Sequence, residues 1–211
     1  MNIENLRPDE IEKRSFGIIA GELAGAGIRL DEKNAAVIMR CIHTSADFDY
    51  ARTLAFSENA VDVMKRLIRG GADIVTDTNM ALAGINKKKL SKYGGRVHCF
   101  MADEDVASEA RQRGLTRAAV SMERAAGIGK DVIFAIGNAP TALIRLHEMM
   151  ENHTFTPEFV IGVPVGFVNV VRAKELFLDS AVPHIINRGR KGGSGIAAAI
   201  CNAVLYEMEQ E

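Results

Sequence analysis

The chain has 211 residues, of which 47% are hydrophobic and 25% charged, and its 26 basic and 27 acidic side chains leave a net charge of -1. This length and composition predict one domain, residues 1–211, with a sizeable core. The balanced charge argues against nucleic acid or a membrane surface as the partner. No apolar run approaches the ~18 residues that span a bilayer, and the opening residues lack a signal-peptide pattern. We therefore expect a cytoplasmic protein.

Helical patterns dominate the N-terminal segment, about residues 1–57, which contains no convincing strand. Apolar residues at helical spacing between Phe16 and Leu23 mark one helix, and Ser15 lies on its more apolar side. The run 31–39 predicts a second, amphipathic helix, which an acidic and turn-prone stretch follows. We expect this helical segment to pack on the remainder of the chain.

From about residue 58 onward, short apolar runs alternate with helical patterns. The runs are rich in β-branched and aromatic residues and show little polar alternation, as in strands that are covered on both faces. The alternation predicts an α/β fold with helices on both faces of a mainly parallel sheet. The predicted strands are 72–76, 96–100, 132–136, 159–163 and 184–186, and the predicted helices between and after them are 59–69, 140–152 and 193–208.

His43 lies just beyond the second predicted helix, with Arg40 three residues earlier on the same helix face. Histidine changes its charge near neutral pH, and the C-terminal end of a helix favours the protonated ring. This pairing predicts a site that donates a proton to an anionic ligand. Asp47 and Asp49 could hold the imidazole ring, although capping of the turn after the helix is the favoured interpretation.

Polar or glycine-rich residues follow each predicted strand, at the sheet edge where open α/β proteins bind their ligands. Two of these stretches, 137–140 and 188–194, lead into predicted helices, whose first N–H groups can bind an anion. At the first stretch, a ligand contact at Asn138 and ordinary helix-start chemistry remain equally open. The second adds cations, including Arg190 and Lys191, whose mutual repulsion favours an anionic ligand.

Other chemistries find less support. Cys41, Cys99 and Cys201 form neither a disulfide framework nor a metal site, and Cys41 is expected to be a buried hydrophobe rather than a nucleophile. No zinc spacing, Walker motif or dinucleotide fingerprint is present, so a nucleotide-dependent enzyme is a weak alternative and no metal ligands are predicted. His98 and His184 fall in predicted strands, where satisfied core histidines are expected.

Six blocks in order resemble the precorrin-8X methylmutase family of corrin biosynthesis, over roughly residues 10–205. The two most specific are Ile-Gly-Asn-Ala-Pro-Thr-Ala-Leu and Pro-Val-Gly-Phe-Val. The stretches after Ile42 and Val75 look more like the branch of the family that uses a cobalt-containing substrate. The six blocks are Lys13–Phe16, Arg40–Tyr50, Thr76–Met80, Ile136–Leu143, Gly162–Val168 and Gly189–Ser194.

The resemblance implies a three-layer α/β/α Rossmann-like fold, a homodimer and an isomerase that needs no separate cofactor. The implied reaction moves a methyl group from C11 to C12 of precorrin-8X or cobalt-precorrin-8, giving hydrogenobyrinate or cobyrinate. Cobalt, if present, would arrive inside this tetrapyrrole substrate. The rival hypothesis is a non-catalytic module that binds a tetrapyrrole or another anion in the same crevice.

The resemblance also implies roles for individual residues. His43 matches the catalytic acid of the family, and Ser15 and Arg40 match residues that contact the substrate. Arg117 looks like a further arginine near the macrocycle. A flat, partly apolar macrocycle rimmed with carboxylates needs cations and helix N-termini at its edge. We therefore add as candidates for substrate binding the residues of the two sheet-edge loops, Asn138, Arg190 and Lys191.

Overall fold

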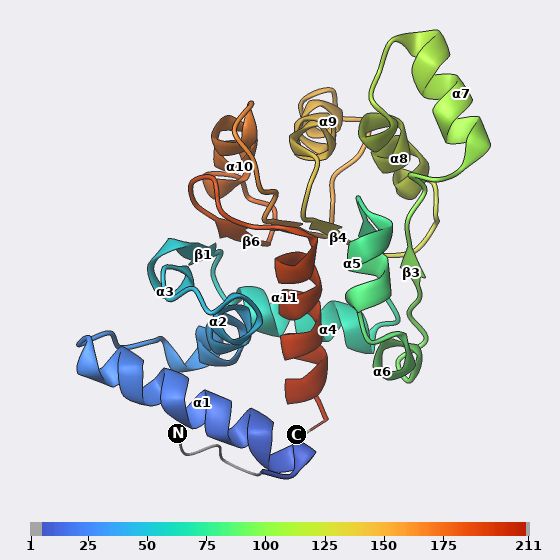
Figure 1. Ribbon diagram of the computed structural model, residues 1–211. Coiled ribbons are helices and arrows are strands. Elements are labelled where there is room, and N and C mark those ends of the chain that lie inside the picture. The colour runs from blue at the N-terminus through green and yellow to red at the C-terminus, as the bar shows by residue number, and fades with distance from the viewer. Residues whose placement is uncertain (1–5, 210–211) are drawn as a thin grey trace.

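The computed structural model describes residues 6–209 and places a sheet between two layers of helices (Figure 1). The strands are β1 Leu54–Phe56, β2 Asp73–Thr76, β3 Val97–His98, β4 Val132–Ile136, β5 Phe159–Gly162 and β6 His184–Asn187. They lie in the order β1-β6-β5-β4-β2-β3, and every neighbouring pair is parallel except β1 with β6. The predicted three-layer α/β/α fold with a mainly parallel sheet is confirmed.

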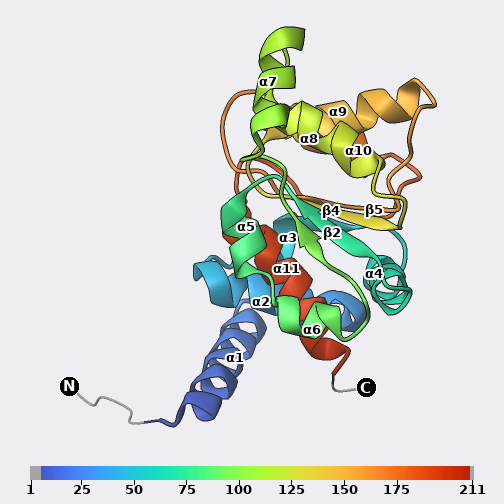
Figure 2. The same cartoon turned by 90° about the vertical axis from the view of Figure 1, so that its right-hand side faces the viewer.

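Helices cover both faces of the sheet, with α8, α9 and α10 on one side and α4 and α11 on the other (Figure 1). α2 packs on α11, and α1 packs on α2 and projects from the body of the molecule (Figure 2). The helices of the described chain are α1 Pro8–Gly25, α2 Glu32–Ser45, α3 Tyr50–Thr53, α4 Ala60–Arg69, α5 Asn79–Gly84, α6 Lys87–Ser91, α7 Glu104–Arg113, α8 Arg117–Ala126, α9 Pro140–Glu151, α10 Val170–Leu178 and α11 Ser194–Glu207.

The apolar strands divide their side chains between two cores. Within β4, Ile133 and Ala135 belong to the core beneath α4 and α11, whereas Phe134 and Ile136 belong to the core beneath α8, α9 and α10. Every residue of β4 is buried, because both faces of a parallel sheet are covered. β4 therefore lacks the alternation of apolar and polar residues that is typical of a strand with one exposed face.

The sequence-based prediction omits one strand. The expectation that the first 57 residues lack a strand is wrong, because Leu54–Phe56 forms β1 and pairs antiparallel with β6, Leu54 lying opposite Asn187. The sheet consequently has six strands rather than about five. The amphipathic helix also runs further than 31–39, from the N-cap Asp31 to Ser45.

The sheet contains a switch point between β2 and β4. From β2 the chain moves outward to the edge strand β3, then returns through α7 and α8 to β4 on the other side of β2. In open α/β sheets, the carboxyl ends of the strands on either side of such a reversal form a crevice that commonly binds the ligand. We call the edge at the carboxyl ends of β2, β4, β5 and β6 the carboxyl edge.

Candidate functional site

His43 lies near a helix C-terminus as predicted, although inside the last turn of α2 rather than just beyond the helix, and its side chain is exposed. The helix ends just beyond it at Ala46, whose left-handed conformation (φ 55°) turns the chain away. The imidazole stacks on Phe16 of α1, with 5.3 Å between ring centroids and 27° between ring planes. No described residue hydrogen-bonds the ring nitrogens, so the ring can present a proton to a ligand in the groove beside it.

Two cavities meet at His43, and we call them together the histidine groove. One, of about 240 Å³, lies between α1 and α2, and Ser15 lines it. The other, of about 260 Å³, lies between α2, α5 and α11, and Arg40 lines it. The second cavity exists because small residues form much of its wall: Gly84, Gly195, Ala198 and Ala199. The groove thus brings together three predicted residues, Ser15, Arg40 and His43.

Arg40 is engaged within the chain. Its guanidinium lies between two rings, 4.8 Å from the centroid of Phe16 and 5.0 Å from that of Tyr206, and its Nη2 is 2.6 Å from Oε1 of Glu12. The hydrogen bond from Arg40 lowers the pKa of the Glu12 carboxyl. The guanidinium of Arg40 is therefore already paired with a carboxylate of the chain itself.

The remaining predicted residues lie at or near the carboxyl edge. Arg117 is the first residue of α8, Asn138 precedes α9, and both side chains are exposed. A hydrogen bond of 3.0 Å from Thr116 Oγ1 to Thr141 Oγ1 joins the beginnings of the two helices. The structure therefore places Arg117 and Asn138 on neighbouring elements, away from the α1–α2 part of the histidine groove.

The expected anion site at the start of α9 is already filled. Asp77, directly after β2, accepts hydrogen bonds from the backbone N–H groups of Gly137, Asn138 and Ala139 at 2.8, 2.7 and 2.5 Å. Its carboxylate is fully buried, and this burial raises its pKa. Of the two interpretations left open for this turn, the structure favours helix-start chemistry for the backbone N–H groups, because Asp77 satisfies them across the switch point. Only the Asn138 side chain remains as a candidate contact.

Asp77 is one of the polar residues that follow the predicted strands, but nothing in the sequence marks it as a site residue. Its partners lie 60 to 62 residues away, so no local pattern reveals the interaction. A tight contact reinforces it: a Cβ at Gly137 would lie 2.7 Å from Ser194 Cα. Asp77 and the close approach of Gly137 to Ser194 thus occupy the backbone at the switch point.

The loop 188–193 between β6 and α11, which we call the basic loop, carries Arg190 and Lys191. Arg190 lies over the exposed Phe167 ring, 5.4 Å from its centroid. Lys191 Nζ lies 2.6 Å from the carboxylates of both Asp47 and Asp49. The chain itself therefore supplies counterions for Lys191, whereas we expected a ligand to provide them, and none of the described carboxylates pairs with Arg190.

Asp47 and Asp49 do not have the role that we considered beside His43. Their side chains bind Lys191, and Asp47 Oδ1 also accepts a hydrogen bond of 3.0 Å from the Asp49 N–H. The favoured interpretation, capping of the turn after α2, is confirmed for Asp47. Sequence reasoning could not find the ion pairs, because 144 residues separate Asp47 from Lys191.

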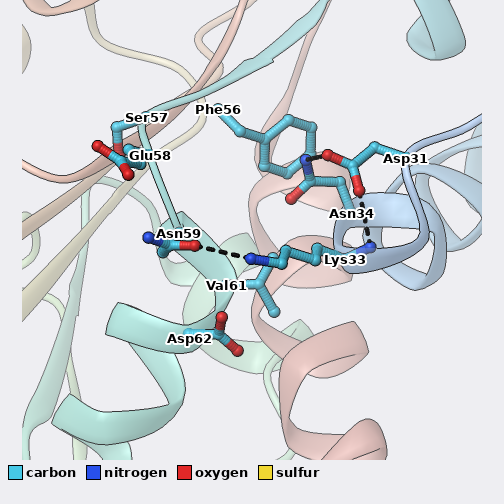
Figure 3. Close-up of a pocket in the computed structure, with 9 residues that line it drawn as sticks. All are labelled: Asp31, Lys33, Asn34, Phe56, Ser57, Glu58, Asn59, Val61 and Asp62. Atoms are coloured by element: carbon cyan, nitrogen blue, oxygen red, sulfur yellow. Dashed lines mark hydrogen bonds between the residues drawn. The ribbon is translucent and has the colours of Figure 1, made fainter.

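A larger cavity, of about 410 Å³, lies at the opposite end of α2 (Figure 3). Its polar groups bind one another: Lys33 Nζ donates to Asn59 Oδ1 at 2.9 Å, and the Lys33 N–H donates to Asp31 Oδ1 at 3.0 Å. Asp31 and Lys33 thereby serve as the N-terminal cap of α2 and its tie to α4. We assign this cavity to the packing of the two helices and place the site at the His43 end.

Three residues for which the sequence predicts only structural roles behave as expected. Cys41 is buried, and desolvation raises the pKa of its thiol to about 12, which suppresses a nucleophilic thiolate. His98 Nε2 lies 2.8 Å from Asp73 Oδ2, and His184 Nδ1 lies 2.8 Å from the carbonyl oxygen of Val182. These histidines are satisfied within the fold.

No helix within residues 6–209 is long and apolar enough to cross a membrane. No group of three or more His, Cys, Asp and Glu side chains in the same range is arranged to hold a metal ion.

The fold and site define an α/β protein with a groove that combines an exposed histidine, a serine and an arginine. Comparison with known proteins supports this description of the fold. The model of the precorrin-8X methylmutase family matches residues 10–207. A cobalt-precorrin-8 methylmutase from Salmonella typhimurium is 42% identical and covers 97% of each chain. A precorrin-8X methylmutase from Pseudomonas aeruginosa is 37% identical over 94% of this chain and 95% of its own.

A solved structure shows the same architecture. The precorrin-8X methylmutase of Thermus thermophilus superposes with a TM-score of 0.84 at 34% identity, covering 95% of this chain and 98% of its own. The chain therefore belongs to the precorrin-8X methylmutase family, whose members are isomerases. The rival hypothesis of a non-catalytic binding module is not favoured by these relatives.

Proposed function

We propose that the protein catalyses migration of a methyl group from C11 to C12 of precorrin-8X or cobalt-precorrin-8, giving hydrogenobyrinate or cobyrinate. The observation that carries the proposal is the position of His43, exposed between two cavities and with Arg40 lining the second. The family membership supports the same reaction.

Methyl migration rearranges bonds within one molecule. The bond from C11 to the methyl carbon breaks, the bond from C12 to that carbon forms, and no atom is gained or lost. A concerted shift of this kind needs no nucleophile, but it needs the conjugated ring in a reactive tautomer. The imidazolium of His43 acts as a general acid and gives its proton to a ring nitrogen, and the product later returns a proton.

Stacking suits His43 to this role. Phe16 fixes the plane of the imidazole without consuming either ring nitrogen. His43 lies in the last turn of α2, and none of the described residues hydrogen-bonds its ring nitrogens. Its donor is thereby free to meet the macrocycle.

The substrate is flat and carries carboxylates at its rim. Ser15 and Arg40 bind it within the histidine groove, and a substrate carboxylate replaces Glu12 on Arg40. Arg117, Asn138 and Arg190 meet the rim at the carboxyl edge, where none of the described carboxylates pairs with either arginine. Lys191 can bind the substrate only if it exchanges Asp47 or Asp49 for a substrate carboxylate.

We also propose that the protein acts as a homodimer in the cytoplasm and that each chain unfolds as one unit. Support comes from exposed apolar side chains around the carboxyl edge, which a second copy or the macrocycle can cover: Met80, Val165, Phe167 and Val168. Light scattering checks the dimer, and a single calorimetric transition checks the folding unit. A monomer at micromolar concentration, or two resolved transitions, would contradict these proposals.

The function is tested by supplying the purified protein with precorrin-8X and with cobalt-precorrin-8 in parallel. Methyl migration changes the conjugation of the ring, so the visible spectrum reports turnover directly. Conversion of either substrate supports the proposal and shows which form the enzyme uses. Binding of both macrocycles without any spectral change would favour the non-catalytic module.

A further inference from the structure

The basic loop is fastened to the fold through its backbone. Lys174 on α10 donates from Nζ to the carbonyl oxygens of Gly189 and Lys191, both at 2.8 Å. Asn187 at the end of β6 donates from Nδ2 to the same Lys191 oxygen at 2.7 Å. Both donors are buried, with 1% and 0% of their surface exposed. Buried donors therefore hold the backbone carbonyl groups of the loop.

The side chain of Lys191 then connects this loop to the turn between α2 and α3. Its ammonium lies 2.6 Å from Asp47 and 2.6 Å from Asp49, and Asp47 follows His43 by four residues. The hydrogen bond from Lys191 lowers the pKa of the Asp47 carboxyl, which therefore stays ionised at neutral pH. One residue thus joins the loop that carries Arg190 to the segment that carries His43.

Charge argues against a simple ligand role for Lys191. One ammonium between two carboxylates leaves a local charge of about -1, so an approaching substrate carboxylate is repelled rather than attracted. Arg190, one residue earlier, has no such partner among the described residues and lies over Phe167. Neighbouring cations of one loop therefore face different electrostatic surroundings.

We propose that Lys191, held by Lys174 and Asn187 and paired with Asp47 and Asp49, is a positioning residue that fixes the basic loop relative to the His43 turn. The proposal rests on the proposed function, because it assigns the pairing a role in setting the acid against a substrate-binding cation. It also revises the expectation from sequence that Lys191 contacts the substrate.

Lys174 is the anchor of this connection. Its ammonium is buried, none of the described carboxylates pairs with it, and desolvation lowers its pKa to about 8. A buried cation is unfavourable unless its hydrogen bonds are satisfied. A neutral amine keeps two N–H donors, so both carbonyl oxygens of the loop remain bound when Lys174 loses its proton.

The test compares Lys191→Met with the double variant Asp47→Asn/Asp49→Asn, using kcat and KM of the full-length enzyme. A positioning role predicts that each lowers kcat about tenfold, changes KM by less than about twofold, and gives no further loss when both are combined. Lys191→Arg should restore most of kcat. Lys88→Met, at an exposed position of α6, is the matched control and should match the wild type.

If Lys191 instead binds the substrate, the two variants should change KM in opposite directions. Lys191→Met would then raise KM at least tenfold with kcat retained, whereas Asp47→Asn/Asp49→Asn would lower KM by freeing the ammonium. That pattern would overturn the proposal. Thermal melting curves identify any variant that has lost its fold, and Lys191→Arg then keeps the comparison decisive.

A readout without substrate separates this proposal from the proposed function. Hydrogen exchange of the amides in residues 188–193 should quicken in both Lys191→Met and Asp47→Asn/Asp49→Asn, and remain at the wild-type rate in Lys88→Met. Unchanged exchange in the first two variants overturns the positioning role, even if the enzyme is active. If exchange quickens in the variants while the wild type converts neither substrate, the proposed function is wrong. The connection between the basic loop and the His43 turn is still supported in that case.

Discussion

The carboxyl edge and the α1–α2 side of the histidine groove are built in opposite ways. At the carboxyl edge, buried polar groups such as Asp77, Lys174 and Asn187 bind backbone atoms of neighbouring loops. In the groove, His43 and Arg40 are held by ring stacking and by one ion pair to the half-exposed Glu12. Buried hydrogen bonds are costly to break, whereas exposed pairs exchange readily.

The carboxyl edge thus serves as a rigid framework, and the histidine groove is the surface where we expect the chemistry. The edge sets the positions of the loops before any ligand arrives, and such preorganisation avoids an ordering cost on binding. The groove holds His43 and Arg40 by ring stacking and one half-exposed ion pair, and an ion pair of this kind is easily exchanged for a ligand contact. Substitutions at the edge should therefore change stability first, and substitutions in the groove should change turnover first.

The largest expected effect is in the groove. His43→Asn removes the proton donor and should lower kcat by about 10²–10⁴-fold, the usual contribution of a general acid. The melting temperature should stay close to that of the wild type, because the ring is exposed and no described residue hydrogen-bonds it. Absorbance of the corrinoid and a melting curve provide the two measurements. Conversion at the wild-type rate would remove His43 from the mechanism.

At the edge, Gly192→Ala should destabilise the fold by about 2–4 kcal/mol. Gly192 has φ 153°, a conformation that favours glycine, and a Cβ there would clash with the carbonyl oxygen of Val163. Gly195→Ala is the matched control, because that position is helical and open, so alanine should be neutral or stabilising. Chemical denaturation measures both. Equal stability of the two variants would show that the loop yields easily.

The charge on Lys174 makes a distinct contribution to the pH dependence of stability. Its pKa is about 8 in the folded protein and 10.5 for an ordinary lysine, so between these limits the unfolded chain binds more protons. The wild type should gain roughly 1–3 kcal/mol relative to Lys174→Met as the pH rises from about 8 to 10.5. Denaturation at several pH values checks the sign. Parallel curves for the two proteins would contradict the assignment.

The smallest expected effect returns to the groove. Glu12→Gln removes the internal carboxylate from Arg40, and an exposed pair of this kind contributes about 0.2–1 kcal/mol, so KM should fall by about 1.4- to 5-fold. Glu175→Gln, at an exposed position of α10, should leave KM unchanged. Initial rates at varied substrate concentration decide the matter. A rise in KM would mean that Glu12 aligns Arg40 for the substrate instead of competing with it.

Sequence patterns predicted those parts of the fold that depend on nearby residues. Strand β4 and helix α9 begin where the apolar run and the proline indicate, because burial on both faces and a helix start are local properties. Strand β1 was missed, because its three residues, 54–56, are too few for a pattern and it is formed by pairing with β6.

The same distinction holds for the site. His43 at a helix end was predictable from residues 31–46, which form one local element. The partners of Asp77 and Lys191 were not, because each lies at least 60 residues away along the chain. Residue types indicated where charge gathers, whereas only the fold determines which charges neutralise one another.

The antiparallel pairing of β1 with β6 has a consequence for how the protein is made. His43 leaves the ribosome early, but β1 cannot pair until residues 185–187 emerge, and part of the cavity wall belongs to α11, residues 194–207. Contacts between segments so distant in sequence form late and slowly. The growing chain therefore carries His43, the proposed acid, without its complete cavity until α11 has emerged.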